Sequence, residues 1–124
     1  MDRRLFLWGL AIWIAATAAL RVAGQYVLRP GPWTGAVVLF AISFPLMALL
    51  GRRLCSRLPT GQERLAGAVS LLLPTLVLDP FSSAFFPAVF PNMAPEVAGV
   101  FGGWMLCCCA GALVGVAIRP PSPA

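Results

Sequence analysis

The chain has 124 residues, of which 60 % are hydrophobic and only 10 % are charged, and its formal net charge is +5. Soluble domains contain about 25 % charged residues, and a chain this short has too small an interior to hide so much apolar surface from water. The composition therefore excludes an ordinary soluble domain. All nine basic residues are arginine, but they form no stripe with interleaved aromatic residues, which argues against a nucleic-acid partner.

Four apolar runs, each almost free of charge, follow one another along the chain: Leu5–Leu20, Trp33–Leu50, Leu65–Leu78 and Val97–Ile118. The arginines between these runs are sorted by side. One side carries Arg3, Arg4, Arg52, Arg53, Arg57, Arg64 and Arg119, and the other carries only Arg21 and Arg29. Because arginine is enriched in cytoplasmic loops, this pattern predicts an all-α, four-helix integral membrane bundle in the bacterial inner membrane, with both termini in the cytoplasm.

The first run has a second interpretation, because a basic start, an apolar stretch and Ala16-Thr17-Ala18 also fit a cleaved signal peptide. Trp8 and Trp13 within the run, and the three spans that follow, favour a retained signal anchor. A full crossing needs about 20 residues. We therefore expect the span to reach about Leu28, which places Arg21 near its outer end.

The second run follows Arg29-Pro30-Gly31-Pro32, a sequence that predicts a turn. Inside the run, Pro45 removes one backbone hydrogen bond and predicts a kink, which neighbouring groups can compensate. The loop over residues 51–64 is polar and rich in arginine. Within it, Thr60 and Glu63 have the spacing of a capping box that leads into the third span.

The third run is unusual, because Leu65–Leu78 is short for a crossing and contains Pro74. Asp79-Pro80 ends it, and the Phe81–Phe90 segment that follows is too apolar for a free loop. Either the span continues past Asp79 with a break, or the segment lies in the outer interface. We expect a broken or interfacial, Phe-rich segment.

The fourth run follows Glu96, whose charge favours the positive end of a helix dipole. We expect a single four-span domain over residues 1–118 and a disordered, proline-rich tail over residues 119–124. Two G-x-x-x-G patterns within the fourth run predict close helix packing, inside the bundle or in a dimer: Gly99 with Gly103, and Gly111 with Gly115.

Polar residues near the outer ends of the spans form the main candidate site. Asp79 and Arg21 lie at similar distances from the start of their runs, and a carboxylate at that depth is costly unless it is paired or hydrated. We expect an Arg21–Asp79 pair, with Gln25 on the same helix face as Arg21 and with Asn92 and Glu96 closing over it. Such a cluster either fixes helix packing or binds an ion, a lipid head group or a small polar solute.

The remaining reactive residues do not suggest catalysis. Cys107, Cys108 and Cys109 point about 100° apart on a helix and lack a C-x-x-C spacing, so we expect packing rather than metal or redox chemistry. Cys55, at the end of the second span, is a plain thiol or an acylation site. The chain has no histidine and no phosphate-binding glycine loop. We expect no enzyme activity, no cofactor and no metal.

Several of these residues together resemble a known family. Arg21 with Gly24-Gln25, Asp79 after the third run, and Phe90-Pro91-Asn92-Met93 before the fourth resemble a small bacterial membrane-protein family of unknown function, DUF5367. The resemblance implies a four-helix membrane protein. It marks Arg21, Asp79, Asn92 and Met93 and implies no activity or catalytic residue.

Two functional interpretations follow. The first is a non-enzymatic membrane protein that binds a ligand or associates with a partner, either a second copy or another membrane protein. The second is a small dimeric transporter or channel that uses Asp79 as its ion or coupling site. Small multidrug transporters have a similar length but a glutamate within the first span, where this chain has Arg21 nearer the end. Fluoride channels have a Phe- and Ser-rich break that Phe81–Phe85 resembles faintly, but the polar asparagine of their second span is absent here.

Overall fold

The computed structural model describes residues 2–118; the tail predicted over residues 119–124 lies outside the described residues. Four helices are long and apolar enough to cross a membrane: α1 (Arg3–Ala23), α2 (Thr34–Cys55), α3 (Gly61–Ala84) and α5 (Ala98–Ala117). Three short elements complete the fold: the 3-10 turns η1 (Gly24–Tyr26) and η2 (Pro95–Val97), and the one-turn helix α4 (Phe86–Val89). The predicted all-α, four-span class is confirmed.

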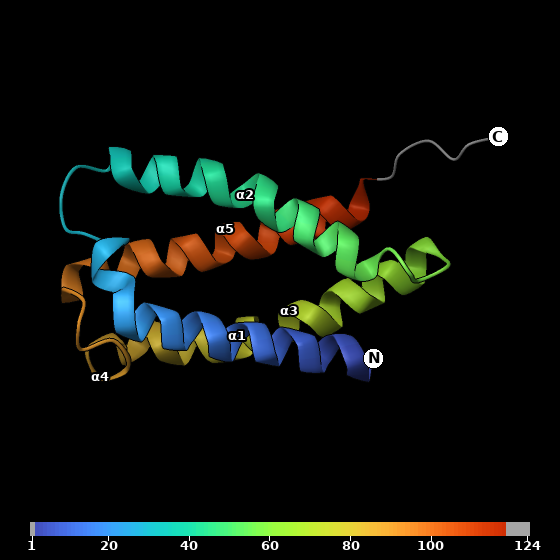
Figure 1. Cartoon of the computed structure of the whole chain (residues 1–124), viewed down its shortest axis with the longest axis horizontal. Helices are drawn as coiled ribbons and strands as arrows, with labels where there is room; N and C mark the ends of the chain where they lie inside the picture. Colours follow the sequence, from blue (N-terminus) through green and yellow to red (C-terminus); the bar gives the residue numbers. More distant parts are fainter. Residues whose placement is uncertain (1, 119–124) are drawn as a thin grey trace.

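The four long helices alternate in direction. Figure 1 shows the N-terminus, the α2–α3 connection and the end of α5 at one end of the bundle, with the α1–α2 connection and α4 at the other. Helix α1 packs on α3, α3 on α5, and α5 on α2, whereas α1 and α2 form no substantial interface. The end that holds the N-terminus carries Arg3, Arg4, Arg52, Arg53, Arg57 and Arg64, and the opposite end carries Arg21 and Arg29.

Helix α3 is longer than the sequence predicted. It begins at Gly61, where the hydroxyl oxygen of Thr60 accepts the backbone N–H of Glu63 at 3.1 Å, and it continues through both internal prolines to Ala84. The span therefore continues past Asp79-Pro80 before it breaks, which is the first of the two predicted alternatives. A proline removes one backbone hydrogen bond, a loss that a helix packed among others can sustain. The break falls at Phe85, which lies between α3 and α4 in a non-helical conformation.

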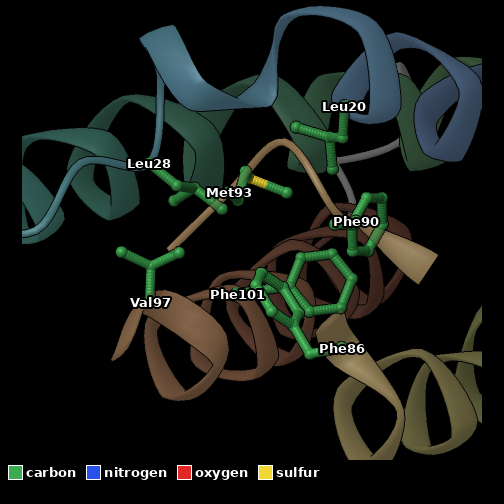
Figure 2. Close-up of a cluster of buried hydrophobic side chains, with 7 residues drawn as sticks. All are labelled: Leu20, Leu28, Phe86, Phe90, Met93, Val97 and Phe101. Carbon is green, nitrogen blue, oxygen red and sulfur yellow. The ribbon is translucent and has the colours of Figure 1, made fainter. Parts of the chain in front are cut away.

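The Phe-rich segment after the break packs onto the bundle. Phe86 and Phe90 are buried, and their rings lie with that of Phe101 from α5 at centroid distances of 5.1–5.6 Å. Phe81 and Phe85 are exposed. Figure 2 shows the three rings within a larger buried cluster that joins α1, the α1–α2 connection and α5: Leu20, Leu28, Phe86, Phe90, Met93, Val97 and Phe101. Only half of the phenylalanines in the segment therefore face lipid or the interface.

Close backbone approach holds α5 against α2. A methyl group added to Gly111 or Gly115 would overlap the carbonyl oxygen of Phe44 or Ala48 in α2. Gly103 lies against the ring of Phe40, 3.3 Å from an added Cβ, whereas nothing lies within 4 Å of such an atom on Gly99. The packing role predicted for Gly99 is therefore not seen, because that residue lies on an open side of the helix near its first turn.

We predict that Gly115→Ala lowers the free energy of unfolding by about 1–3 kcal/mol, because the new methyl group forces α5 away from α2. Gly99→Ala, on the same helix but in open space, should leave stability unchanged or raise it slightly. The comparison is made by denaturant unfolding in detergent micelles, followed by helix circular dichroism. Equal midpoints for the two variants would contradict the proposed contact.

Candidate functional site

Asp79 is a buried carboxyl group in the middle of the bundle. It lies on α3, and only 8 % of the residue is exposed. Its Oδ1 accepts the indole N–H of Trp13 on α1 at 2.8 Å. A buried indole N–H needs an acceptor, and an aspartate within a membrane span needs a donor, so the bond satisfies both groups and joins α1 to α3.

The second carboxyl oxygen has no such partner. Asp79 Oδ2 is buried and no hydrogen bond to it is found within residues 2–118. A buried acceptor without a donor costs about 1–3 kcal/mol, more when it is charged. The burial of Asp79 Oδ2 is therefore not compensated by any hydrogen bond within the described residues.

Asp79 lines a cavity of about 300 Å³ to which all four long helices contribute. The walls are mostly apolar or aromatic, and small residues on α1 leave room between the helices. The lining consists of Gly9, Ile12, Trp13, Ala16, Thr17, Ala19, Leu20, Met47, Leu50, Gly51, Leu71, Leu72, Thr75, Asp79, Phe101, Trp104, Met105, Cys108, Cys109 and Ala112. An apolar cavity with one or two polar groups is the usual composition of a small-molecule site.

The cavity opens on the side of the bundle. Ala16 and Ala19 line it and are also exposed, and both belong to the middle and outer part of α1. Because α1 and α2 form no substantial interface, the wall between them is incomplete. Exposed residues of α1 therefore lie at the edge of the cavity.

A second tryptophan strengthens the opposite wall. Trp104 on α5 donates its indole N–H to the hydroxyl oxygen of Ser43 on α2 at 2.8 Å. Nearby, the thiol of Cys107 lies 3.6 Å from the carbonyl oxygen of Phe40. These contacts reinforce the α2–α5 pair.

Arg21 does not pair with Asp79. Its residue is exposed, and the hydrogen bond at Asp79 comes from Trp13 instead. The register of the two helices explains the error. Residues of α1 and α3 that meet are 62–68 positions apart in sequence, as in Gly9–Leu71, Asp2–Ser70 and Trp13–Asp79. Arg21 and Asp79 are closer in sequence by four or more positions, which displaces them by at least roughly 6 Å along the helix axis.

Gln25 and Asn92 do come together, at the outer end of α1. The Asn92 amide donates to the backbone carbonyl of Leu20 at 2.9 Å and to the Gln25 side-chain oxygen. The Leu20 carbonyl oxygen also accepts the backbone N–H of Gly24, and the Gln25 side-chain N–H caps the carbonyl oxygen of Val22 in the last turn of α1 at 3.2 Å. The two Asn92 bonds tie the loop before α5 to α1, while Glu96 on η2 is exposed. The five predicted residues thus separate into a capping pair, a buried carboxyl group and two exposed charges.

The cysteines are distributed as their helix positions require. Cys108 and Cys109 line the cavity, whereas Cys107 contacts α2. Within residues 2–118, no group of three or more His, Cys, Asp or Glu residues is placed to hold a metal ion.

Sequence reasoning missed Trp13, the partner of Asp79. One signal was present: Trp13 lies ten residues after the start of α1, far from both membrane interfaces, where tryptophan is normally enriched. An indole at such a depth needs a buried acceptor. Asp79 directly follows the third apolar run, whereas Asp2, Glu63 and Glu96 precede the runs that they border.

Comparison with known families gives one match. The model of a family described as "Family of unknown function (DUF5367)" matches residues 31–120. The chain belongs to this family. Of the residues that suggested the resemblance, Asp79, Asn92 and Met93 lie inside the matched range, and Arg21 and Gln25 precede it. No curated protein and no solved structure matches the chain.

We predict that Trp13→Phe destabilises the bundle by about 1–3 kcal/mol, because it leaves both oxygens of the buried Asp79 carboxyl group without a donor. Trp8→Phe, on the same helix but at an exposed position, is the matched control and should have little effect. Combining Trp13→Phe with Asp79→Leu should recover most of the loss, because the unpaired acceptor is removed. Unfolding midpoints in detergent measure all three, and a Trp8→Phe loss as large as that of Trp13→Phe would contradict the role of the hydrogen bond.

Proposed function

We propose that this DUF5367 member is a non-enzymatic membrane protein that binds an amphiphilic molecule in the cavity between its helices. The apolar part of the ligand would occupy the space between α1, α2 and α5, and an N–H donor would bind Asp79. The observation that supports this most directly is the buried Asp79 Oδ2 without a partner beside a cavity of about 300 Å³. That volume is at the lower end of the range for small-molecule sites, about 300–1,000 Å³.

The absence of catalysis in this proposal rests on the side-chain chemistry of the chain. The chain has no histidine. The buried hydroxyl groups of Ser70 and Ser82 donate to backbone carbonyls of their own helix, Ala66 and Leu78, and not to a general base. A nucleophile requires an adjacent base within hydrogen-bond reach.

The proposal predicts selective binding of a primary alkylammonium ion. In lipid nanodiscs, dodecylammonium should bind the protein at least about ten times more tightly than dodecyltrimethylammonium, since both carry one positive charge but only the first can donate a hydrogen bond. Quenching or shift of tryptophan fluorescence reports binding, because Trp13 and Trp104 line the cavity.

Two variants make this experiment decisive. Asp79→Asn should abolish the preference, whereas Glu96→Gln, which removes one exposed carboxylate at the outer end, should preserve it. Equal affinity of the two ammonium ions for the wild-type protein would show partition into lipid rather than binding at Asp79.

A transporter is the second candidate, and the position of the same carboxyl group favours it. Asp79 lies within a span, beside a cavity that all four helices line, as a coupling residue must. In this version two copies would form the working unit. Proteoliposomes loaded with a pH-sensitive dye would show proton movement when dodecylammonium is added, and Asp79→Asn would abolish it; binding without proton movement would favour the first proposal.

We also propose that the arginine-rich end of the bundle faces the cytoplasm, in the inner membrane of a bacterium. Its support is the distribution of arginine between the two ends. In a cysteine-free background, Arg57→Cys should react with an impermeant maleimide only after the cells are opened. Arg29→Cys, exposed at the other end, should react in intact cells. The reverse result would invert the topology.

A further inference from the structure

A pocket between the first turn of α1 and the last turn of α2 collects positive charge. It has a volume of about 260 Å³ and contains three arginines, Arg4, Arg53 and Arg57. The remaining lining residues are Asp2, Leu5, Trp8, Leu54 and Leu58. It lies at the end of the bundle that holds the N-terminus, far along α1 from the outer capping pair (Figure 1).

The single carboxylate in the pocket is already engaged. Asp2 is the N-cap of α1, and its Oδ1 accepts the backbone N–H of Leu5 at 3.2 Å. Its own backbone N–H donates to the buried hydroxyl oxygen of Ser70 on α3 at 2.9 Å. These two bonds fix the start of α1 beside α3, so that the pocket has a defined wall. Its three arginines against one carboxylate leave a surplus of positive charge.

A shallow, open and mostly apolar groove on the face of α1 continues from this pocket. The groove shares Arg4 and Trp8 with the pocket and adds Arg3, Leu7 and Ala11. Leu7 and Trp8 are 57 % and 48 % exposed. Arginines therefore lie at the helix end and apolar side chains follow toward the membrane centre. A molecule that matches both parts has an anionic head and a hydrocarbon chain.

We propose that this pocket and groove form a binding site for an anionic phospholipid. The phosphate would lie among Arg4, Arg53 and Arg57, and an acyl chain would run along Leu7, Trp8 and Ala11. Guanidinium groups bind phosphate oxygens in pairs, and basic pockets between membrane helices bind anionic head groups. The site is separate from the Asp79 cavity and does not depend on the function proposed for it.

The test is lipid binding by the full chain in detergent, followed by native mass spectrometry. Phosphatidylglycerol and phosphatidylcholine with identical acyl chains are compared, and inorganic phosphate is the third arm. Wild-type protein should bind phosphatidylglycerol about ten times more tightly or better, since each arginine near a head group contributes about one kcal/mol, roughly five-fold. Equal binding of the two lipids would overturn the proposal. So would binding of inorganic phosphate that displaces the lipid at equal concentration, which would show a free-anion site.

A pair of double variants separates the pocket from general charge. Arg53→Gln with Arg57→Gln should remove the preference for phosphatidylglycerol. Arg52→Gln with Arg64→Gln removes the same charge at the same end, outside the pocket, and should retain the preference. Equal losses in the two double variants would indicate diffuse attraction and overturn the site.

A readout that leaves every arginine in place covers the case in which a double variant does not fold. Phosphatidylglycerol with brominated acyl chains should quench the wild-type tryptophan fluorescence more strongly than brominated phosphatidylcholine. The difference should disappear in Trp8→Phe, because Trp8 lines both the pocket and the groove. A difference that persists in Trp8→Phe would place the lipid elsewhere.

Discussion

Close contact between helix backbones is the constraint on which this bundle depends. In lipid, apolar side chains gain little by meeting one another, so helices associate where small residues let their backbones approach. Gly111 and Gly115 provide this for α5 against α2, and Gly9 provides it for α1 against the backbone of Leu71 on α3. The Trp13–Asp79 bond and the Asp2–Ser70 bond lie on the same α1–α3 contact.

The position of the cavity follows from which helices pack closely on one another and which do not. Among the long helices, α1 packs mainly on α3, while α2 packs mainly on α5. Helices α1 and α2 stand at the two ends of this series of contacts and form no substantial interface with each other. The small side chains of α1 leave space between them. Asp79 therefore holds α1 in place through its hydrogen bond with Trp13, and it also contributes a polar group to the lining of the resulting space. One oxygen of the carboxyl group is hydrogen-bonded to Trp13, and the other is buried without a partner among the described residues.

The sequence predicted the features that depend on local composition. Four apolar runs and the arginines at their ends are required by the bilayer itself, and they were sufficient for the number of spans and their alternating direction. The register of α1 against α3 was not predictable in this way. It depends on α3 starting at Gly61 under the Thr60 cap, four residues before the apolar run, and on backbone contacts such as that of Gly9. Asp79 was recognised because a carboxylate in a span is conspicuous, but its partner depended on that register. Likewise, the Phe81–Phe90 segment is uniformly apolar, and only the break at Phe85 determines that Phe86 and Phe90 turn inward.

Phe101 connects two features that were described separately. Its ring packs against Phe86 and Phe90 in the outer cluster, and it also lines the cavity that contains Asp79. The aromatic cluster therefore covers the outer end of the cavity, while the open side lies along α1. A molecule that reaches Asp79 by that side has first dissolved in the bilayer. Its occupancy is then governed by its concentration in the lipid phase, so that affinities measured against the aqueous concentration combine a partition coefficient with the binding constant of the site.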